Sequence, residues 1–293
     1  MLAASFSDGS INCINAIKEK NSLKIIELKS EKISNEIKNY PLDSKEYKHF
    51  FSETFNKMFS TINYNQNENI SICMDSDWIE TKVLPVDTKI DNSVKKKYLL
   101  WYLNQRNSNL IQESKVFFKN LNFIHGKNSF VLCTIVPKTI FDLLKFCSAN
   151  NFLRPVFLEP SIISIERVIS KNTTIFFSNS QLTKIYLYDK GVIIGEGECK
   201  IKSNLIDLIF FSGDIDKAKN IINKINENIL DEKFDVLHSN DFPKESLKFF
   251  SLRKKIFSKL NPSISKSFTI DLSIRNKKND LSIFSELFGL ISR

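Results

Sequence analysis

Two short turns carry the side chains best suited to holding an anion. The first is Ser7-Asp8-Gly9-Ser10, whose glycine accepts the positive φ of a tight hairpin and lets backbone N–H groups approach a phosphate. The second is Ser212-Gly213-Asp214, which stands before an amphipathic segment. Each turn also has a structural interpretation. The first fits a plain hairpin, and Ser212 or Asp214 fits the N-cap of a helix, whose N-terminus could also attract an anion.

The other reactive residue types form no recognised catalytic or metal-binding pattern. The five cysteines are odd in number, widely spaced and mostly set in apolar segments, which predicts buried free thiols. The three histidines are scattered, so we expect no metal. The carboxylates Asp75, Asp77 and Glu80 fit either a solvated loop or acid–base work. With seven glycines and no GxSxG, GxGxxG or P-loop, the chain has little capacity for phosphate-cradling loops.

The formal net charge of +9 is dispersed along the sequence. Only Lys95 to Lys97, Arg253 to Lys255 and Lys277-Lys278 form short basic runs, which fit solvated faces or contacts with acidic phosphates or anionic lipid. No helix-turn-helix, RNP-like aromatic pair or GXXG loop accompanies them, so a nucleic-acid-binding module is a weaker hypothesis. No apolar run reaches the roughly 18 residues of a spanning helix, and the start lacks the features of a signal peptide. We therefore expect a cytoplasmic protein.

The elements that must position these turns are clearest between Phe130 and Ile169. The apolar, β-branched run from Phe130 to Val136 predicts a strand that is covered on both faces. A helix follows and ends near Asn150-Asn151. Pro155 to Leu158 predicts the next strand, and Pro160 stands in the first turn of a helix that reaches Ile169. We predict a parallel β-α-β-α unit, and hence the α/β class.

The same order of elements appears twice along the chain. In the first half we expect strands at Leu2 to Phe6, Ile11 to Glu19 and Leu23 to Leu28, a helix at Ser44 to Ile62, and a strand at Ile70 to Met74. In the second half we expect strands at Thr174 to Phe177, Thr183 to Tyr188, Val192 to Gly197 and Asp207 to Phe211, a helix from Ile215 to Ile229, and a strand at Phe234 to Leu237. The turn Asp189-Lys190-Gly191 joins two of these strands.

These elements predict two lobes. The first spans residues 1–170 with an inserted subdomain at about 77–127, and the second, shortened lobe spans 171–293. Near the C-terminus we expect a basic helix (Glu245 to Leu260), a strand (Ser267 to Ile274) and a last helix (Leu281 to Ile291). The apolar face of the last helix fits docking on the fold better than contact with a membrane surface.

Three stretches share their pattern with a known family. They are AASFSDGSINCINAI at the start, TKVLPVD (Thr81 to Asp87) with a helix containing Trp101 after it, and FVLCTIVPKTIFDLLKFCSANNFLRPVFLEPSIISIERVI. The first is similar to the first strand, phosphate hairpin and second strand of the duplicated actin-like (ribonuclease H-like) proteins, and specifically of the PilM type of type IV pilus assembly. The second resembles the inserted subdomain of that type, and the third matches most closely. The resemblance implies an α/β fold of two lobes, the second reduced.

The residues that hold ATP in that family are largely replaced here. ATP-binding members resemble one another in an acidic residue and glycines at the first hairpin, a second Asp-x-Gly hairpin, and a Gly-Gly turn near adenosine. Ser5 and Ser7 stand at the first acid and glycine positions, and Phe177 and Asn179 at the second. Because a large aromatic side chain offers neither a ligand to Mg²⁺ nor room for a phosphate, we expect no hydrolysis, no catalytic residue and no cofactor. The vestigial cofactor-binding positions are Ser7, Asp8, Gly9, Ser10 and Gly213.

The resemblance implies a non-catalytic cytoplasmic scaffold of a type IV pilus or type II secretion platform, at the cytoplasmic face of the inner membrane. Its partner would be the cytoplasmic tail of a single-span inner-membrane protein of the PilN type, bound in an extended form in a groove. Other platform subunits are further expected partners. The alternative is a divergent ATPase or phosphotransferase of the actin-like superfamily, whose pocket would be built from unfamiliar residues.

Overall fold

The computed structural model divides the chain into two compact units. The first consists of Met1–Trp78, Thr139–Ile169 and Phe257–Arg293, and the second of Ile79–Lys138 and Ser170–Ile256. Within them, the structure describes residues 1–7, 10–18, 22–75, 78–106, 108–167, 169, 173–179, 183–202, 205–227, 234–238, 269–271 and 285–291. Both units are therefore assembled from segments that lie far apart in the sequence.

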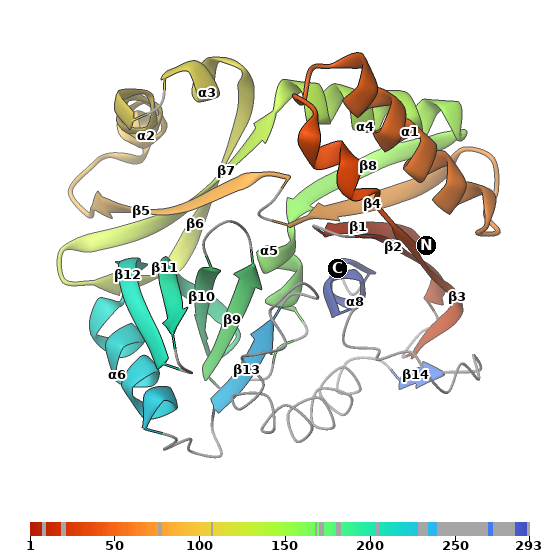
Figure 1. The fold of residues 1–293 in the computed structure, drawn as a ribbon. Coiled ribbons are helices and arrows are strands. Elements are labelled where there is room, and N and C mark those ends of the chain that lie inside the picture. Colours follow the sequence, from red (N-terminus) through yellow and green to blue (C-terminus); the bar gives the residue numbers. More distant parts are fainter. Residues whose placement is uncertain are drawn as a thin grey trace. The chain divides into compact units, whose positions relative to one another are not determined.

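The first unit is built on a six-stranded sheet with the order β14-β3-β2-β1-β4-β8 (Figure 1). Three strands form an antiparallel meander, namely β1 (Leu2–Ser7), β2 (Ser10–Lys18) and β3 (Ser22–Lys32). The strands β4 (Glu68–Met74) and β8 (Leu153–Pro160) extend it in parallel beyond β1, and β14 (Thr269–Asp271) runs parallel to β3 at the other edge.

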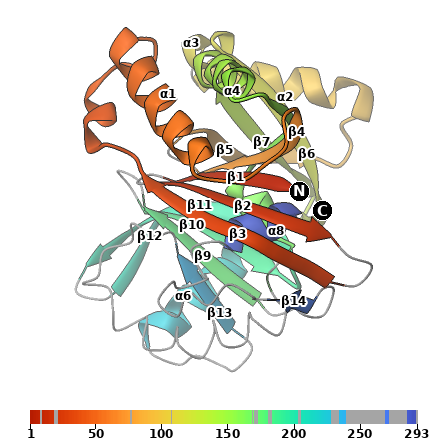
Figure 2. The ribbon, with the colours of Figure 1, turned by 90° about the vertical axis from the view of Figure 1, so that its right-hand side faces the viewer.

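Helices cover both faces of this sheet. Figures 1 and 2 show α1 (Lys45–Ser60) and α4 (Lys138–Asn150) on one face and α8 (Ser285–Ile291) on the other. The side chain of Ser44 caps α1 by accepting a hydrogen bond from the N–H of Tyr47 at 3.0 Å. Apolar side chains spaced three and four residues apart give α1 one buried face, where the ring of Phe51 stacks on Phe6 with centroids 5.5 Å apart. A short 3₁₀ helix, η1 (Asn35–Asn39), precedes α1.

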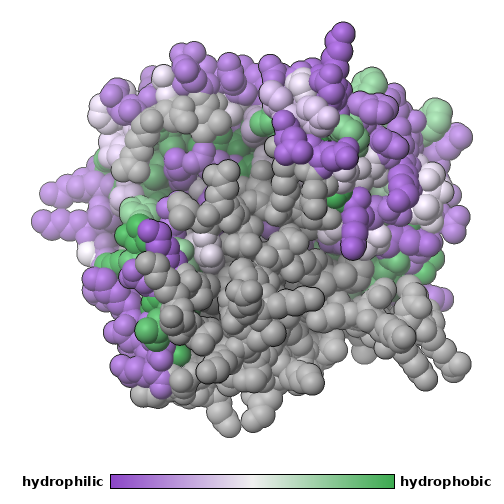
Figure 3. Space-filling model, viewed as in Figure 1, coloured by the Kyte–Doolittle hydropathy of each residue, from purple (hydrophilic) through white to green (hydrophobic). Residues whose placement is uncertain are grey.

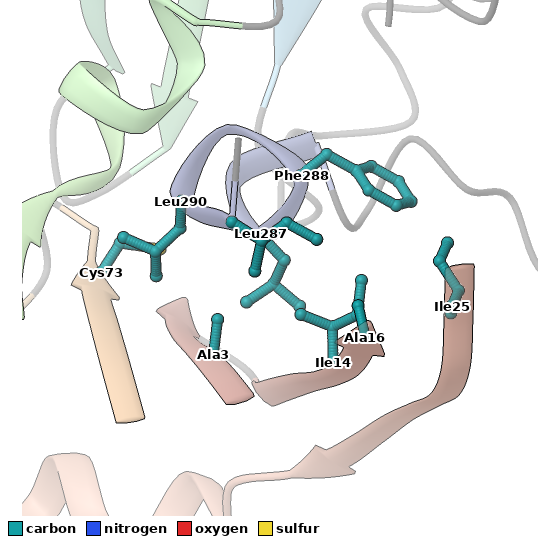
Figure 4. Packing of buried hydrophobic residues seen from close by; sticks show 9 residues of the cluster. Ala3, Ile14, Ala16, Ile25, Cys73, Leu287, Phe288 and Leu290 are labelled. Atoms are coloured by element: carbon teal, nitrogen blue, oxygen red, sulfur yellow. The ribbon is translucent and has the colours of Figure 1, made fainter. Parts of the chain in front are cut away.

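The C-terminal helix α8 closes the second face of the sheet. Figure 4 shows its apolar side chains against the sheet, and the cluster comprises Ala3, Ile14, Ala16, Ile25, Cys73, Leu287, Phe288, Leu290 and Ile291. Gly289 lets α8 approach α5 (Ser161–Ile165), because a Cβ at this position would collide with the carbonyl oxygen of Ser164. The guanidinium of Arg167 binds the buried carboxylate of Glu159 through both oxygens, with Nη2 to Oε2 at 2.8 Å, and also donates to the Gly289 carbonyl at 3.2 Å.

The second unit contains a three-stranded antiparallel sheet with the order β5-β7-β6. Its strands are β5 (Glu80–Asp87), β6 (Ser114–His125) and β7 (Asn128–Pro137). One face is covered by α2 (Asn92–Arg106) and α3 (Ser108–Gln112), and the shared core consists of Leu84, Val86, Leu99, Leu103, Ile111, Val131, Cys133 and Ile135.

A five-stranded sheet with the order β12-β11-β10-β9-β13 forms the rest of the second unit. Its elements are β9 (Thr173–Asn179), β10 (Thr183–Asp189), β11 (Val192–Lys202), β12 (Leu205–Gly213), α6 (Ile215–Asn226) and β13 (Phe234–His238). The predicted turn is confirmed, since Lys190 and Gly191 both have positive φ. The order β11-β10-β9-β13, with the last pair parallel, repeats the order β3-β2-β1-β4 of the first unit. The predicted repeat of architecture is confirmed.

The predicted parallel β-α-β-α unit is wrong in its first pairing. The strand β7, which contains Phe130 to Val136, pairs antiparallel with β5 and β6, whereas β8 pairs in parallel with β4. An apolar run shows that both faces of a strand are covered, but it does not show which strands are its neighbours. β7 also carries the sheet of the inserted segment past the expected end at residue 127. The helix expected to reach Ile169 ends at Ile165.

The end of the chain differs from expectation in one respect. The helix expected at Glu245 to Leu260 lies outside the described residues, and the strand expected at Ser267 to Ile274 is described only as Thr269–Asp271. The last helix docks on the fold, as expected. However, it packs on the sheet of the first unit, although the sequence pattern placed it with the second lobe. In the described part of the chain, no helix is long and apolar enough to cross a membrane.

Candidate functional site

The predicted anion-binding residues lie in both units. Ser7 and Ser10 are backbone partners in the register of the β1–β2 hairpin, and Asp8 and Gly9 lie outside the described residues. Gly213 ends β12 in the second unit. The proposed role of these residues in holding a cofactor stays a prediction.

A neutral hydrogen-bonded pair lies at Ser5, where the resemblance leads us to expect the first acid of ATP-binding relatives. Ser5 is fully buried in β1, and Asn12, its cross-strand partner on β2, donates from Nδ2 to Ser5 Oγ at 3.4 Å. A serine that is covered in this way presents no carboxylate to a metal ion.

Gly213 has a structural reason to be glycine. Its φ of +137° is rarely adopted by other residues, and an added Cβ would collide with the carbonyl oxygen of Ile194 and lie 2.6 Å from the Cα of Gly195. The following residue, Asp214, caps α6 by accepting the N–H of Lys217 at 3.0 Å. The predicted capping role is therefore confirmed for Asp214. Ser212 does not cap the helix, because its hydroxyl donates to the Val83 carbonyl at 2.5 Å.

The acidic cluster after β4 does not form one solvated loop. Asp75 is 1% exposed within the first unit, and Asp77 lies outside the described residues. Loss of solvent, together with the charge of Asp75, raises the pKa of Glu286 on α8 to about 8. Glu80 is half-buried in the second unit, where its carboxylate pairs with Lys82 at 2.6 Å. The solvated-loop interpretation is therefore wrong for Asp75.

A cleft in the second unit was not predicted. Its volume is about 580 Å³, and residues 80–85 of β5, 196–198 of β11 and 210–213 of β12 form most of its wall, with Tyr102, His125, Asn128, Phe130, Lys184 and Ile215. The wall is mainly apolar, but it includes ionisable side chains from both sheets. This combination of an apolar surface with a few polar groups is typical of binding sites.

A row of three polar side chains holds β5 at the back of this cleft. Tyr186 on β10, Glu196 on β11 and Ser212 on β12 are direct cross-strand neighbours. The Tyr186 hydroxyl lies 3.1 Å from Thr81 Oγ1, Glu196 Oε1 accepts the Val83 N–H at 2.5 Å, and Ser212 Oγ donates to the Val83 carbonyl. Both outward backbone groups of Val83 are therefore satisfied by side chains of the five-stranded sheet.

Glu196 is the most perturbed group of the cleft. Burial raises its pKa to about 8, and the Val83 N–H, the charges of Lys184 and Lys82, and a hydrogen bond with Thr81 oppose this effect. The carboxyl is therefore mainly protonated at neutral pH. The glycines on either side of it leave room for Phe211, because a Cβ at Gly197 would lie 2.8 Å from that ring. A glutamate between two glycines, directly after the apolar residues Val192 to Ile194, is the signal that could have identified this site.

The free edge of β12 is partly closed by a second side-chain contact. Asn226, at the end of α6, accepts the N–H of Ile206 at 2.8 Å and donates to its carbonyl at 2.9 Å, as a partner strand would. Elsewhere on this strand Leu205, Ile209 and Phe210 are about half exposed. Figure 3 shows green apolar surface among hydrophilic residues where Figure 1 places β12 and α6.

The cleft is suited to binding a ligand and holding it in position. Its one strongly perturbed group is a carboxylic acid whose Oε1 accepts a backbone hydrogen bond from Val83. His125 lies at the rim, 3.9 Å from the Asp214 carboxylate. Across the described residues, no group of three or more His, Cys, Asp and Glu side chains could hold a metal ion.

Comparison with known proteins identifies the fold. No protein-family profile and no curated protein sequence matches this chain. The structure of a PilM–PilN type IV pilus biogenesis complex matches with a TM-score of 0.60 at 10% identity, covering 100% of this chain and 97% of that one. The cytoplasmic domain of EpsL, an inner-membrane component of the type II secretion system of Vibrio cholerae, has a TM-score of 0.40 at 9% identity, with coverage of 65% and 67%. A Ppx/GppA family member of Aquifex aeolicus has a TM-score of 0.38 at 6% identity, with coverage of 99% and 87%. The first of these matches, together with the repeated sheet order, shows that the chain has the duplicated actin-like fold of PilM-type proteins.

Proposed function

We propose that this chain is a non-catalytic scaffold of a type IV pilus or type II secretion platform, located at the cytoplasmic face of the inner membrane. Its partner is the cytoplasmic tail of a single-span membrane protein of the PilN type, bound as an extended peptide. The observation that carries the proposal is the match over the whole chain to PilM in a complex with PilN. At 10% identity that match concerns the fold, so the partner has to be tested directly.

The replaced nucleotide positions support the non-catalytic part of the proposal. Ser5 lies buried against Asn12, where ATP-binding relatives are expected to have an acid. At the second position Phe177 lies within β9, in register with Ile185 on one side and His238 on the other. The position is thus part of a continuous strand and carries an aromatic residue in place of an acid.

Peptide binding tests the partner. Fluorescein-labelled peptides would be made from the cytoplasmic tails of the single-span membrane proteins encoded beside this gene, and titrated with the whole chain by fluorescence anisotropy. We expect one tail to bind at least about tenfold more tightly than a scrambled peptide of the same composition, a difference of about 1.4 kcal/mol. The scrambled peptide controls for the attraction between a basic protein and any acidic peptide. Equal binding of every tail and its scrambled form would contradict the proposal.

A thermal-shift measurement with ATP and Mg²⁺ tests the non-catalytic part separately. A ligand present at 100 times its Kd stabilises the folded state by about 2.7 kcal/mol, which raises Tm by several degrees in a chain of this size. We expect no such rise. A rise that requires both ATP and Mg²⁺ would favour the divergent ATPase or phosphotransferase instead.

A further inference from the structure

The outer edge of β12 is open beside the cleft. Residues 210–213 of this strand all line the cleft. Because successive side chains of a strand point to opposite faces, four consecutive lining residues indicate that the cleft borders the edge of β12 and not one face alone. Figure 1 shows β12 as the last strand of its sheet, in agreement with the order β12-β11-β10-β9-β13. A ligand in the cleft would therefore meet backbone groups as well as side chains.

The length of the open edge is limited by Asn226. This side chain bonds to the N–H and the carbonyl of Ile206, as a partner strand would. From Leu208 to Ser212, the outer edge has no hydrogen-bond partner among the described residues. At roughly 3.4 Å per residue this stretch is about 17 Å long, which is enough for one short strand. Lysine and proline commonly protect exposed edges, but β12 contains neither of them.

The surface beside this edge is apolar. Ile209 and Phe210 are 49% and 51% exposed, and Phe210 lines the cleft together with Phe130 and Tyr102. An added strand would direct every second side chain toward the cleft, and its backbone would pair with the outer N–H and carbonyl groups of β12. Backbone pairing and the burial of alternate side chains are together the way in which proteins recognise an extended peptide.

The charges of the cleft favour an uncharged segment. Lys82 is paired with Glu80, and Lys184 is the cross-strand neighbour of Glu198, so these two lysines and two glutamates of the wall balance. The raised pKa of the remaining acid of the wall, Glu196, keeps it mainly neutral. A charged side chain that entered the cleft would lose water without finding an unmatched charge of opposite sign. An apolar segment without charged residues leaves the balance as it is.

Net charge argues against a second copy of this chain as the occupant. Residues 79–138 and 170–256 form the second unit, and they contain 24 lysines and arginines but only 16 aspartates and glutamates. The formal net charge of this unit is therefore +8. Pairing of β12 with the same strand of another copy would bring two such units together against their repulsion.

We propose that the open edge of β12 and the adjoining cleft bind an uncharged, apolar peptide segment of another protein as an added strand. The inference goes beyond the proposed function, which assigns the membrane tail to no particular site. It holds whether or not that tail is the segment that binds here.

Selection from a peptide library tests the chemistry of the segment. Random 12-residue peptides displayed on phage would be selected against the whole chain in about 0.5 M salt, which screens the attraction between the basic unit and acidic peptides. We expect the enriched sequences to share about five consecutive residues without charge, with apolar side chains at alternate positions. No enrichment over phage that display no peptide, or enrichment of acidic sequences without this pattern, would overturn the proposal.

Two matched substitutions test the location of the site. Phe210→Ala removes an aromatic ring from the cleft wall. Phe117→Ala removes a ring that is equally exposed, at 50%, from β6 of the same unit, and Phe117 does not line the cleft. With a fluorescein-labelled form of the most enriched peptide, we expect Phe210→Ala to weaken binding at least about tenfold and Phe117→Ala to leave it unchanged. Equal binding by the two variants would overturn the site.

Hydrogen exchange tests strand addition in the wild-type chain. The bound peptide should slow exchange of the outer-edge amides between Leu208 and Ser212 and leave the amides of β6 unchanged. Methylation of alternate peptide nitrogens adds a second readout, because only the set that faces β12 should abolish binding. Equal sensitivity of both sets would overturn strand addition. A dimer of the free chain in sedimentation velocity that Phe210→Ala dissociates would overturn the proposed occupant and identify a second copy instead.

Discussion

The buried carboxyl of Glu196 should make the stability of the second unit depend on pH. Its pKa in the folded chain is about 8, compared with 4.5 for a solvated glutamate, because burial disfavours the charged form. Between these two values the folded chain keeps a proton that the unfolded chain has released. The free energy of unfolding therefore falls as pH rises. The contribution is complete below about pH 4.5 and is lost as pH rises through 8.

The size of the effect follows from the two pKa values. They differ by about 3.5 pH units, and each pH unit corresponds to about 1.36 kcal/mol, so the full loss is on the order of 4 to 5 kcal/mol. This loss is comparable with the lower end of the net stability of folded domains, which is about 5 to 15 kcal/mol. The second unit should therefore be distinctly easier to unfold at pH 8 than at pH 5.

Glu196→Gln isolates this contribution. The glutamine amide retains an oxygen that can accept the Val83 N–H, but it does not ionise. Urea unfolding at pH 5, 6, 7 and 8, followed by circular dichroism, should show a much flatter pH dependence for this variant and a higher stability than wild type at pH 8. Glu198→Gln removes a half-buried carboxyl on the same strand and should leave the slope unchanged. Glu286, with its raised pKa in the first unit, keeps a residual slope of the same sign in every variant.

Parallel pH profiles for wild type and Glu196→Gln would refute the reasoning, because Glu196 would then be ionised and solvated in the folded chain. A wild-type stability that rises between pH 5 and 8 would refute it as well, since that sign requires a group whose folded pKa is depressed.

Three further predictions concern packing and buried charge. Gly213→Ala should lower the free energy of unfolding by at least about 2 kcal/mol in thermal unfolding, because the added Cβ would collide with the Ile194 carbonyl. The control Gly126→Ala should cost about 1 kcal/mol, because Gly126 has a φ of +61° but open space around it. Equal costs for the two variants would contradict the close approach of the strands at Gly213. Arg167→Gln should lower the free energy of unfolding by about 3 to 5 kcal/mol, because it leaves the buried carboxylate of Glu159 without its ion pair. Adding Glu159→Gln should restore part of this stability, and additive losses in urea unfolding would argue against the pair. All five cysteines are buried, so a thiol reagent should label fewer than one cysteine per native chain within minutes and all five in denaturant. Rapid labelling of the native chain would show that a thiol is accessible.

Local signals predicted many of the individual elements. The helix α1 was predictable because Tyr47, Phe51, Phe55 and Met58 recur at intervals of four and three residues, which a helix places on one face and the two-residue period of a strand does not. The β10–β11 hairpin was predictable because glycine at position 191 permits a turn that twists with its strands. In both cases a few neighbouring residues determine the local structure.

Contacts between distant segments were not predictable in the same way. Glu196 and Val83 are 113 positions apart, and the periodicity of β5 or β11 does not indicate that a side chain of one would bind the backbone of the other. For the same reason Phe130 to Val136 indicated a buried strand without indicating its partners. The solvated-loop interpretation failed for Asp75 because a carboxylate after a strand is usually solvated. The neighbour of Asp75, Glu286, lies on α8, far along the chain.

The place of α8 in the sequence constrains the order of events during synthesis. Every strand of the first unit's sheet leaves the ribosome before this helix does, and so do the described strands of the second unit. Until translation reaches residues 285–291, the face of the sheet around Ile14 and Ala16 lacks its apolar cover. Domains commonly fold as they emerge from the ribosome, so the second unit can complete its core while the first unit still lacks α8. Nascent chains halted shortly before α8 are therefore the stage at which chaperone engagement should be greatest.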